Sequence, residues 1–507
     1  MKVKSINRNE RDARPRAQDV IRVPRNPDPL LHPHERAREA KRALNSVKMQ
    51  RMFAKPFVAA FECGDAVMCL ARHKDRLNAL VAGLADGEAW LWDVSARRPL
   101  RRWVGHSKGV TGVGVLAGGG ESAATCALDG TARVWRTPRA AWEGGDLDTR
   151  GAGASGAAGA PYPSAGATPG TWAGAVTTRA DEAVAVLQSA AGGGLEGLDA
   201  HWRDAGRFST ASSRGVVEHW DPDKSASPIL TLSFEAGARS AAGAGAGLAG
   251  ADAVTSVAFN PAEPDLLAAT GGDRSLLLFD LRAGGAALTR VVMRTRSNAV
   301  SWNPREPMNL VSANDDGHCY SHDLRKPAEP RTVHVGATSA ALCLSWNPTG
   351  LEFACGSADR ALRIFEREAG HAREVYHTKR MQRVLAVSYS GDGTQIASGS
   401  DDANVRLWRA RAAVAEGGAA AMPHARARGA RAYGDAVVER YKHLPDVGRI
   451  RRQRTLPSAV KKAARVRREA GDAATKRLKN RIAHSAPDDP TAKIVPLRRR
   501  RVVGQDE

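Results

Sequence analysis

The chain has few aromatic residues and no long apolar run. Phe, Trp and Tyr together make up 5% of its 507 residues. A helix needs about 20 consecutive apolar residues to cross a bilayer, and the sequence contains no run of that kind. The first residues, Met1–Ser5, include two lysines and lack the apolar centre of a secretion signal. We therefore expect an intracellular, soluble protein with no membrane partner.

Signatures of metal binding and catalysis are also lacking. The six cysteines form no Cys-x-x-Cys pair, so buried free thiols in a reducing compartment are expected instead of a zinc site. Gly243, Gly245 and Gly247 alternate with alanine, but no Lys-Ser/Thr follows them as in a phosphate-binding loop. No Gly-x-Ser-x-Gly elbow with plausible partners occurs. The sequence thus indicates a protein that is not an enzyme and has no catalytic residue, cofactor, metal site or small-molecule substrate.

What the chain does contain is a turn signal that is repeated at a fixed spacing. Each of six aspartates lies six residues before the residue that closes a short strand-like run: Asp86, Asp129, Asp273, Asp316, Asp359 and Asp402. Phe279, His322, Phe365 and Trp408 close four of these runs and follow one another at intervals of 43 residues. A period in the low forties with four short strands per unit is typical of a β-propeller.

The repeated aspartates are expected to have a structural role. A carboxylate at such a position can accept backbone N–H hydrogen bonds within a tight turn. Asp129 is also expected to reach His106 on the neighbouring strand. Catalysis by paired carboxylates would need these residues to converge, and a propeller spreads them around a ring.

Two longer spacings decide the number of blades. Trp220 follows Trp135 by 85 residues, and Phe279 follows Trp220 by 59. The residues by which these two intervals exceed the repeat are rich in Ala and Gly, and such segments bury too little apolar surface to fold alone. We interpret it as insertions in blade three and before blade four of an all-β, seven-bladed propeller. A degenerate eighth blade is the alternative. The segment Pro56–Phe61 is expected to supply the outer strand of the last blade and so to close the ring.

Composition and charge divide the chain into three parts. We predict a basic N-terminal arm over 1–56, the propeller over 57–410 and a basic helical C-terminal domain over 411–507, with low-complexity insertions at about 139–171, 188–198 and 235–252. The net charge of +21 lies at the ends, because residues 1–57 carry +9 and residues 411–507 carry +14. An almost neutral ring with two cationic extensions favours polyanion binding by the extensions.

Helices are expected in both extensions, at His34–Asn45, at Ala432–His443 and from the cap Ser458 to about Ile482. Arginine suits bidentate phosphate binding. We therefore predict contacts to RNA backbones or to an RNA–protein particle through Arg449, Arg451, Arg452, Arg454, Lys461, Lys462, Arg465, Arg467, Arg468, Lys476, Arg477, Lys479, Arg481, Arg498, Arg499, Arg500 and Arg501. A solvated face or a nuclear-import signal is the alternative, above all for the last four.

Motifs outside the repeats resemble the Sof family of WD-repeat proteins. They are Val23–Pro33, Arg42–Asn45, Phe53–Phe57, Tyr376–Gln382 and Arg449–Ser485. The resemblance runs from end to end, apart from the insertions. It implies a nuclear, nucleolar component of the small-subunit processome that contacts pre-ribosomal RNA, the U3 small nucleolar ribonucleoprotein and other processome proteins. It further implies a requirement for this component in processing pre-18S ribosomal RNA.

The same resemblance implies an alternative role, as a substrate receptor of cullin-4 RING ubiquitin ligases. Such receptors carry an aromatic-Asp-x-Arg pattern at the ends of neighbouring repeats. Phe279–Arg282 fits this pattern, and His322–Arg325 fits it in part because His replaces the aromatic residue. The candidate residues for docking the ligase adaptor are Asp280, Arg282, Asp323 and Arg325. Asp-x-Arg is also common after the third strand of propeller blades in general, so both interpretations stay open.

Overall fold

The computed structural model describes residues 34–52, 55–117, 122–136, 183–204, 206–233, 253–283, 287–327, 329–411, 425–453, 456–485 and 502–506. The chain divides into two compact units. The first combines Met1–Phe57 with Arg409–Thr455, and the second combines Val58–Trp408 with Leu456–Glu507. Segments from the two ends of the sequence thus meet within the first unit.

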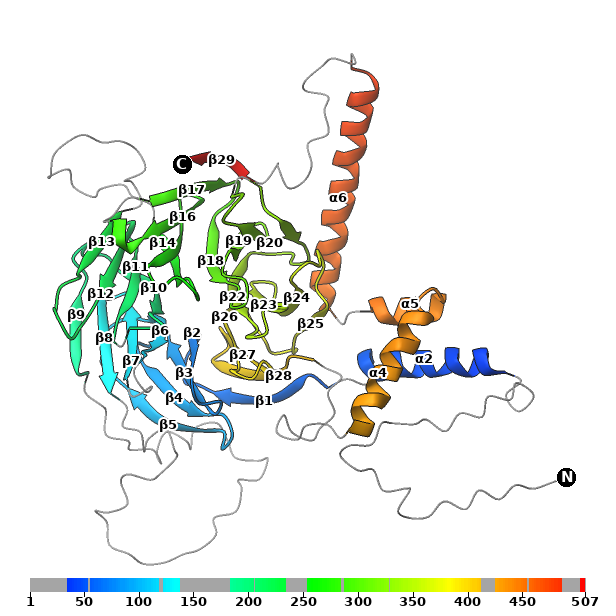
Figure 1. The fold of residues 1–507 in the computed structure, drawn as a ribbon, viewed down its shortest axis with the longest axis horizontal. Helices are drawn as coiled ribbons and strands as arrows, with labels where there is room; N and C mark the ends of the chain where they lie inside the picture. The colour runs from blue at the N-terminus through cyan, green and yellow to red at the C-terminus, as the bar shows by residue number, and fades with distance from the viewer. Residues whose placement is uncertain are drawn as a thin grey trace, which may run out of the picture. The chain divides into compact units, whose positions relative to one another are not determined.

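The second unit is a seven-bladed β-propeller, as the repeat predicts. Within the described residues its strands form seven antiparallel sheets (Figure 1). The innermost strand of each blade contacts that of the next blade, and β26 of blade seven contacts β2 of blade one. An eighth blade is therefore not needed to close the ring, and the alternative interpretation is wrong.

The blades follow the chain in order. Blade one consists of β2 (Val67–Arg72), β3 (Ala79–Leu84), β4 (Ala89–Asp93) and β5 (Arg98–Trp103). Blade two consists of β6 (Val110–Val115), β7 (Ser122–Ala127), β8 (Thr131–Arg136) and β9 (Ala185–Gln188). Blade three consists of β10 (Leu195–Ala200), β11 (Phe208–Ser212), β12 (Val216–Trp220) and β13 (Leu230–Ser233). Blade four consists of β14 (Val254–Phe259), β15 (Leu266–Gly271), β16 (Ser275–Asp280) and β17 (Ala287–Met293). Blade five consists of β18 (Ser297–Trp302), β19 (Asn309–Asn314), β20 (Cys319–Asp323) and β21 (Thr332–His334). Blade six is β22 (Ala341–Trp346), β23 (Glu352–Ser357), β24 (Ala361–Glu366) and β25 (Glu374–Tyr376).

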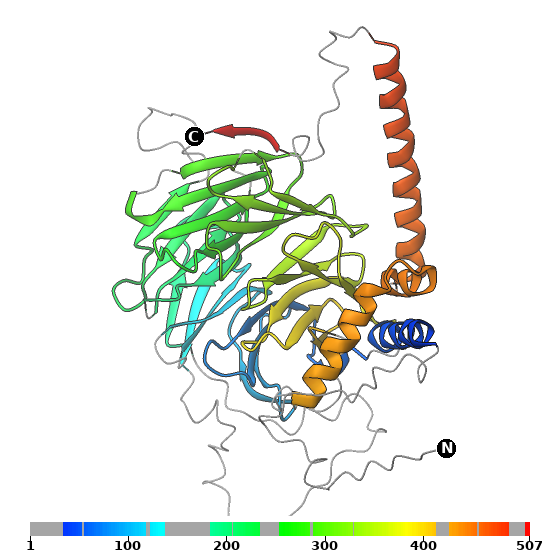
Figure 2. The same ribbon diagram turned by 45° about the vertical axis from the view of Figure 1, so that its right-hand side comes forward.

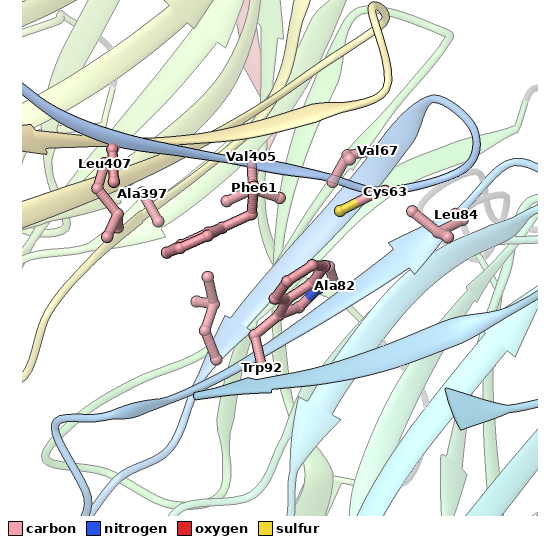
Figure 3. Close-up of a cluster of buried hydrophobic side chains, with 11 residues drawn as sticks. Phe61, Cys63, Val67, Ala82, Leu84, Trp92, Ala397, Val405 and Leu407 are labelled. Atoms are coloured by element: carbon pink, nitrogen blue, oxygen red, sulfur yellow. The ribbon is translucent and has the colours of Figure 1, made fainter. Parts of the chain in front are cut away.

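Blade seven joins the two ends of the ring. It consists of β26 (Val384–Tyr389), β27 (Gln395–Ser400), β28 (Asn404–Arg409) and, as its outer strand, β1 (Phe57–Glu62). This confirms the predicted closure. Figure 3 shows Phe61 of β1 beside Val405 and Leu407 of β28 and above Trp92 of blade one. The Phe61 and Trp92 rings stack with centroids 5.3 Å apart, so the closing strand of blade seven also packs against blade one.

The turn aspartates make the expected backbone contacts in four blades. Asp86, Asp129, Asp273 and Asp316 each accept a hydrogen bond of 2.9 Å from the N–H two residues further on. In blades six and seven, Asp359 and Asp402 accept from the guanidinium groups of Arg363 and Arg406 at 2.9 Å, and Asp359 also accepts the Thr338 N–H at 3.2 Å. The aspartates lie at corresponding turns of different blades, as the sequence predicts.

The expected contact in blade two belongs to a longer network. His106 Nδ1 lies 3.1 Å from Asp129 Oδ2, and His106 Nε2 lies 2.8 Å from Thr125 Oγ1. The Trp135 indole N–H donates to the same threonine oxygen at 2.8 Å. These side chains link the turn to the third strand of the blade, so the aspartate stabilises more than its own turn.

The structure corrects the placement of the insertions. The long Ala/Gly-rich segment lies between β8 and β9, in blade two and not in blade three. Two predicted insertions, 139–171 and 235–252, lie outside the described residues. The third, 188–198, is wrong, because β9 ends at Gln188 and β10 begins at Leu195. A Cβ at Gly194 would lie 3.1 Å from the Leu128 carbonyl oxygen, so this glycine allows a close approach of two chain segments.

Three helices form the core of the first unit: α2 (Glu35–Arg51), α4 (Ala425–Arg440) and α5 (Pro445–Arg452). Their buried apolar side chains are Ala43 and Val47 of α2, Val437 and Val438 of α4, and Val447 and Ile450 of α5. Helix α2 is the predicted helix of the arm, and α4 overlaps the first predicted C-terminal helix. The sequence did not indicate that they pack together.

Two further elements belong to the second unit. Helix α6 (Ser458–Ala483) matches the predicted long helix, but its N-cap is Pro457 without a side-chain hydrogen bond, so Ser458 is not the cap. Strand β29 (Val502–Asp506) pairs with β17 and adds a fifth strand to blade four, as Figure 2 also shows. Each helix within the described ranges is too short or too polar to cross a bilayer.

Candidate nucleic-acid interface

The most strongly charged element of the described chain is α6. Its sequence, rich in Ala, Arg and Lys, consists mostly of good helix formers. It carries nine of the predicted RNA-binding cations: Lys461, Lys462, Arg465, Arg467, Arg468, Lys476, Arg477, Lys479 and Arg481. Its acids are Glu469 and Asp472, and Val460 is its buried residue. A helix that is exposed and polar all round gains little from packing on its own protein.

The structure separates the other predicted cations into two groups. Arg449, Arg451 and Arg452 lie in the last turn of α5, in the first unit. Arg454 and Arg498–Arg501 lie outside the described residues. The predicted RNA-binding set is therefore not one continuous helix, and its members belong to two units of the fold.

One residue of the set is engaged with the propeller itself. Arg467 Nη1 donates to the carbonyl oxygen of Ala337, and Arg467 Nη2 donates to that of Asp316, both at 2.8 Å. Ala337 lies between blades five and six, and Asp316 is the turn aspartate of blade five. This guanidinium therefore anchors α6, and its charge alone could not have distinguished it from its neighbours.

Hydrogen bonds around a buried acid fix the orientation of α2 on α4. Glu39 is 8% exposed, and its Oε2 accepts from the Tyr441 hydroxyl at 3.0 Å and from Arg440 Nη1 at 3.1 Å. Gln50 Nε2 donates to Asp435 Oδ1 at 2.8 Å near the other end of α2. These contacts hold α2 against α4, and Val447 and Ile450 of α5 pack in the same apolar core.

The four candidate adaptor-docking residues form two similar corners. Asp280 Oδ1 accepts from the N–H of Arg282 at 3.0 Å, and Asp323 Oδ1 accepts from the N–H of Arg325 at 3.0 Å. Arg282 lies in the short η4 helix (Leu281–Ala283) after β16 and also approaches Asp265, at 3.4 Å. The side chains of Arg282 and Arg325 are 68% and 74% exposed. Each aspartate therefore stabilises a turn whose arginine side chain is exposed to solvent.

His322, which takes the aromatic position of the second corner, is a core residue. It is 2% exposed, and burial lowers its pKa to about 4. Its Nε2 lies 3.3 Å from Ser312 Oγ. The ring is therefore neutral at physiological pH and fills the space that Phe279 fills in blade four.

Titratable groups of the propeller interior are shifted by burial. The pKa values of the Cys63 and Cys126 thiols rise to about 12, mainly because burial disfavours the thiolate. Asp199 has a pKa raised to about 6 by burial, and its Oδ2 accepts the Phe259 N–H at 2.7 Å. Protonated, buried thiols are poor nucleophiles. Among the described residues, no three His, Cys, Asp or Glu side chains are placed to hold a metal ion.

Comparisons with known proteins agree with this architecture. The family described as Sof1-like domain matches residues 418–502, which include α4, α5 and α6, and the WD domain, G-beta repeat, matches residues 97–136, 329–366 and 373–409. The chain is 36% identical over 489 residues to the Danio rerio protein named DDB1- and CUL4-associated factor 13, and the alignment covers 96% of both chains. The human protein of that name is 33% identical, again over 96% of both chains.

A fungal relative covers a similar span. Protein SOF1 of Saccharomyces cerevisiae is 32% identical over 499 residues, covering 94% of this chain and 92% of the relative. Identity at this level over almost the whole of both chains requires a common fold. The chain therefore belongs to the Sof1-like family of WD-repeat proteins.

Proposed function

We propose that this chain is a non-catalytic scaffold of ribosome biogenesis, a nucleolar component of the small-subunit processome that is required for processing pre-18S ribosomal RNA. The propeller binds proteins of the particle, and the basic helices contact pre-ribosomal RNA or the U3 ribonucleoprotein. The support comes from the family membership and from the separation of charge between the ring and the extensions.

The exposed surface of α6 is the observation that carries the proposal. Nine cations lie on a helix of 26 residues in which Val460 is the buried side chain. Apart from the contact of Arg465 with Glu469 at 3.7 Å and the Arg467 anchor, the described contacts leave most of this charge facing solvent. Exposed arginine and lysine on a helix suit the phosphates of folded RNA, whose recognition depends largely on shape and backbone.

The test removes charge from α6 without removing the helix. Changing Lys461, Lys462, Arg468, Lys476, Arg477 and Lys479 to Gln keeps good helix formers and leaves Arg467 in place. We expect precursors of 18S ribosomal RNA to accumulate and RNA crosslinks of the protein to decrease several-fold in cells that rely on this variant.

A matched control removes the same charge elsewhere. Gln at six exposed propeller positions, Arg136, Arg203, Arg294, Arg296, Lys379 and Arg380, should leave precursor levels unchanged. Equal precursor accumulation in both variants, or in neither, would count against a specific role for α6.

The alternative function is that of a substrate receptor for a cullin-4 ubiquitin ligase. It is favoured by the two exposed arginines at the ends of β16 and β20 and by the name of the animal relatives. Arg282→Ala combined with Arg325→Ala should abolish co-purification with the ligase adaptor. Arg136→Ala combined with Arg203→Ala should not, and retained co-purification in the first variant would exclude docking at these corners.

A further inference from the structure

The first unit contains a groove that is lined by both ends of the chain. It lies between the C-terminal part of α2 and the segment from Lys442 to Gln453, and its volume is about 830 Å³. Ligand sites commonly fall between about 300 and 1,000 Å³. The groove is therefore large enough for a nucleotide and far larger than a single phosphate group needs.

Among the residues that the structure describes, four cations line this groove and no acid does. Lys48 comes from α2, Lys442 from the turn after α4, and Arg449 and Arg452 from α5. Lys442 Nζ also contacts Glu439 Oε1 at 2.5 Å, but Glu439 is not part of the lining. A concave site that gathers positive charge from three segments attracts phosphate more strongly than the same charges spread over a convex surface.

Apart from the polar Gln453, the rest of the lining consists of apolar residues and one histidine. Met52, Leu444 and Ile450 provide apolar surface, and the His443 ring lies at the same groove. Met52 is 54% exposed, although large apolar side chains are usually covered. A sugar and a base can cover such surface and can stack on a planar ring, whereas a phosphate or a phosphorylated serine side chain would leave it uncovered.

A glycine keeps the floor of the groove open. Gly448 lies in the middle of α5, where glycine costs about 1 kcal/mol relative to alanine. A Cβ at this position would lie 3.3 Å from the Lys442 carbonyl oxygen and 3.6 Å from Arg452 Nη2, so it would crowd the lining. The helix thus gives up intrinsic stability at the point where the groove passes beside it.

We propose that this groove binds one nucleotide of single-stranded RNA, with the phosphate between Lys48, Arg449 and Arg452 and the base against Met52, Leu444 and His443. A base can lie against Met52, Leu444 and His443 only when it is not stacked and paired within a duplex, so the bound strand is unpaired. The assignment rests on the RNA contact of the proposed function and adds a defined subsite, one member of which, Lys48, comes from the N-terminal arm.

The experiment measures binding of a fluorescein-labelled single-stranded uridine decamer to the full chain. Lys48→Gln and Arg449→Gln should each weaken binding at least five-fold. Two matched controls should change it less than two-fold: Arg36→Gln and Lys41→Gln, both at exposed positions of α2 outside the groove. Equal effects of all four substitutions would overturn the site, because they would indicate diffuse attraction by charge.

Two further measurements separate the remaining outcomes. A 4-thiouridine decamer, irradiated with the unmodified full chain, should crosslink to the peptides that contain Met52 or His443, and crosslinks confined to α6 would overturn the groove. A phosphoserine peptide that displaces the RNA more effectively than unlabelled decamer would also overturn it. If the unmodified chain binds no RNA, both the proposed function and the groove assignment are contradicted. If it binds RNA and the four substitutions have equal effects, only the groove assignment is contradicted.

Discussion

At the scale of single residues, the same sequence position has two structural solutions. The turn aspartates of blades one, two, four and five accept the N–H two residues further on, whereas Asp359 and Asp402 accept from the arginine four residues further on. The Asp359–Arg363 pair is almost fully buried, with side chains 3% and 1% exposed. Ser357 and Thr338 contact the same pair, so its hydrogen-bonding groups are well satisfied.

Removing one member of this buried pair should be costly. Arg363→Met leaves the Asp359 carboxylate without its counter-charge, and breaking a buried pair in this way costs about 3–5 kcal/mol. Urea unfolding should show this loss in the free energy of unfolding. Arg102→Met is the control, because Arg102 pairs with Glu88 but is 50% exposed, and a surface pair contributes less than about 1 kcal/mol. Losses of equal size would contradict the assigned role of burial.

The same pair predicts a dependence of stability on pH. Burial by itself would raise the pKa of Asp359, but the hydrogen bonds and charge of Arg363 outweigh it and lower the pKa. A lowered folded-state pKa stabilises the fold above the ordinary value of about 4, and this contribution disappears as pH falls through the folded value. The stability lost in Asp359→Asn should therefore be largest near pH 7 and smaller at pH 3 in urea unfolding. A loss that is independent of pH would show that the carboxylate charge is not responsible.

Arg467 should control the mobility of the start of α6. Arg467→Gln removes two charge-assisted hydrogen bonds to carbonyl oxygens of the propeller. Hydrogen exchange of amides near this residue should become about tenfold faster, which corresponds to the loss of about 1.4 kcal/mol. The neighbouring Arg468→Gln should leave exchange unchanged, and similar rates in the two variants would argue against the anchor.

At the scale of elements, β1 has the greatest consequence for the fold. It follows the N-terminal arm in the chain, yet it is the outer strand of the last blade. Its inward residues Ala59 and Phe61 are buried, while Phe57 is 44% exposed. The alternation of buried and exposed positions explains how six residues can join the two ends of the ring.

Phe61→Ala should open the closure. The lost ring packs on Trp92 and beside Val405 and Leu407, and removing a buried Phe side chain costs about 3–5 kcal/mol. Thermal unfolding of the full chain should therefore occur at a lower temperature. Phe57→Ala on the same strand should have little effect. If both substitutions lower the unfolding temperature equally, the core contact at the closure is not the main stabilising feature of β1.

At the scale of the whole molecule, charge and fold are segregated by position in the sequence. The two extensions have an excess of basic residues, and the ring between them is almost neutral. Binding to RNA should therefore weaken with rising salt in proportion to the cations that contact phosphate, at about 0.7 per contact for a single strand.

The salt dependence can locate these contacts. The variant with six Gln in α6 should reduce the slope of log affinity against log salt by as much as about 4, the value for six phosphate contacts. The variant with six Gln in the propeller should leave the slope near that of the unmodified chain. Fluorescence anisotropy over a range of KCl concentrations measures both, and equal slopes would show that the ring contributes as much as α6.

The repeat of 43 residues, the turn aspartates and the apolar strands were local signals, and they determined the seven blades, the closing strand and the long basic helix. The tertiary structure decided what depends on contacts between distant segments: α2 of the arm packs on α4 and α5, Arg467 anchors α6 through carbonyl oxygens, and β29 joins blade four. Composition also misled at 188–198, where glycines that allow close approach resembled an insertion. The physical reason is that periodicity and charge can be seen in short stretches of sequence. The groups that contact a guanidinium or a glycine, in contrast, come from distant parts of the chain that only folding brings together.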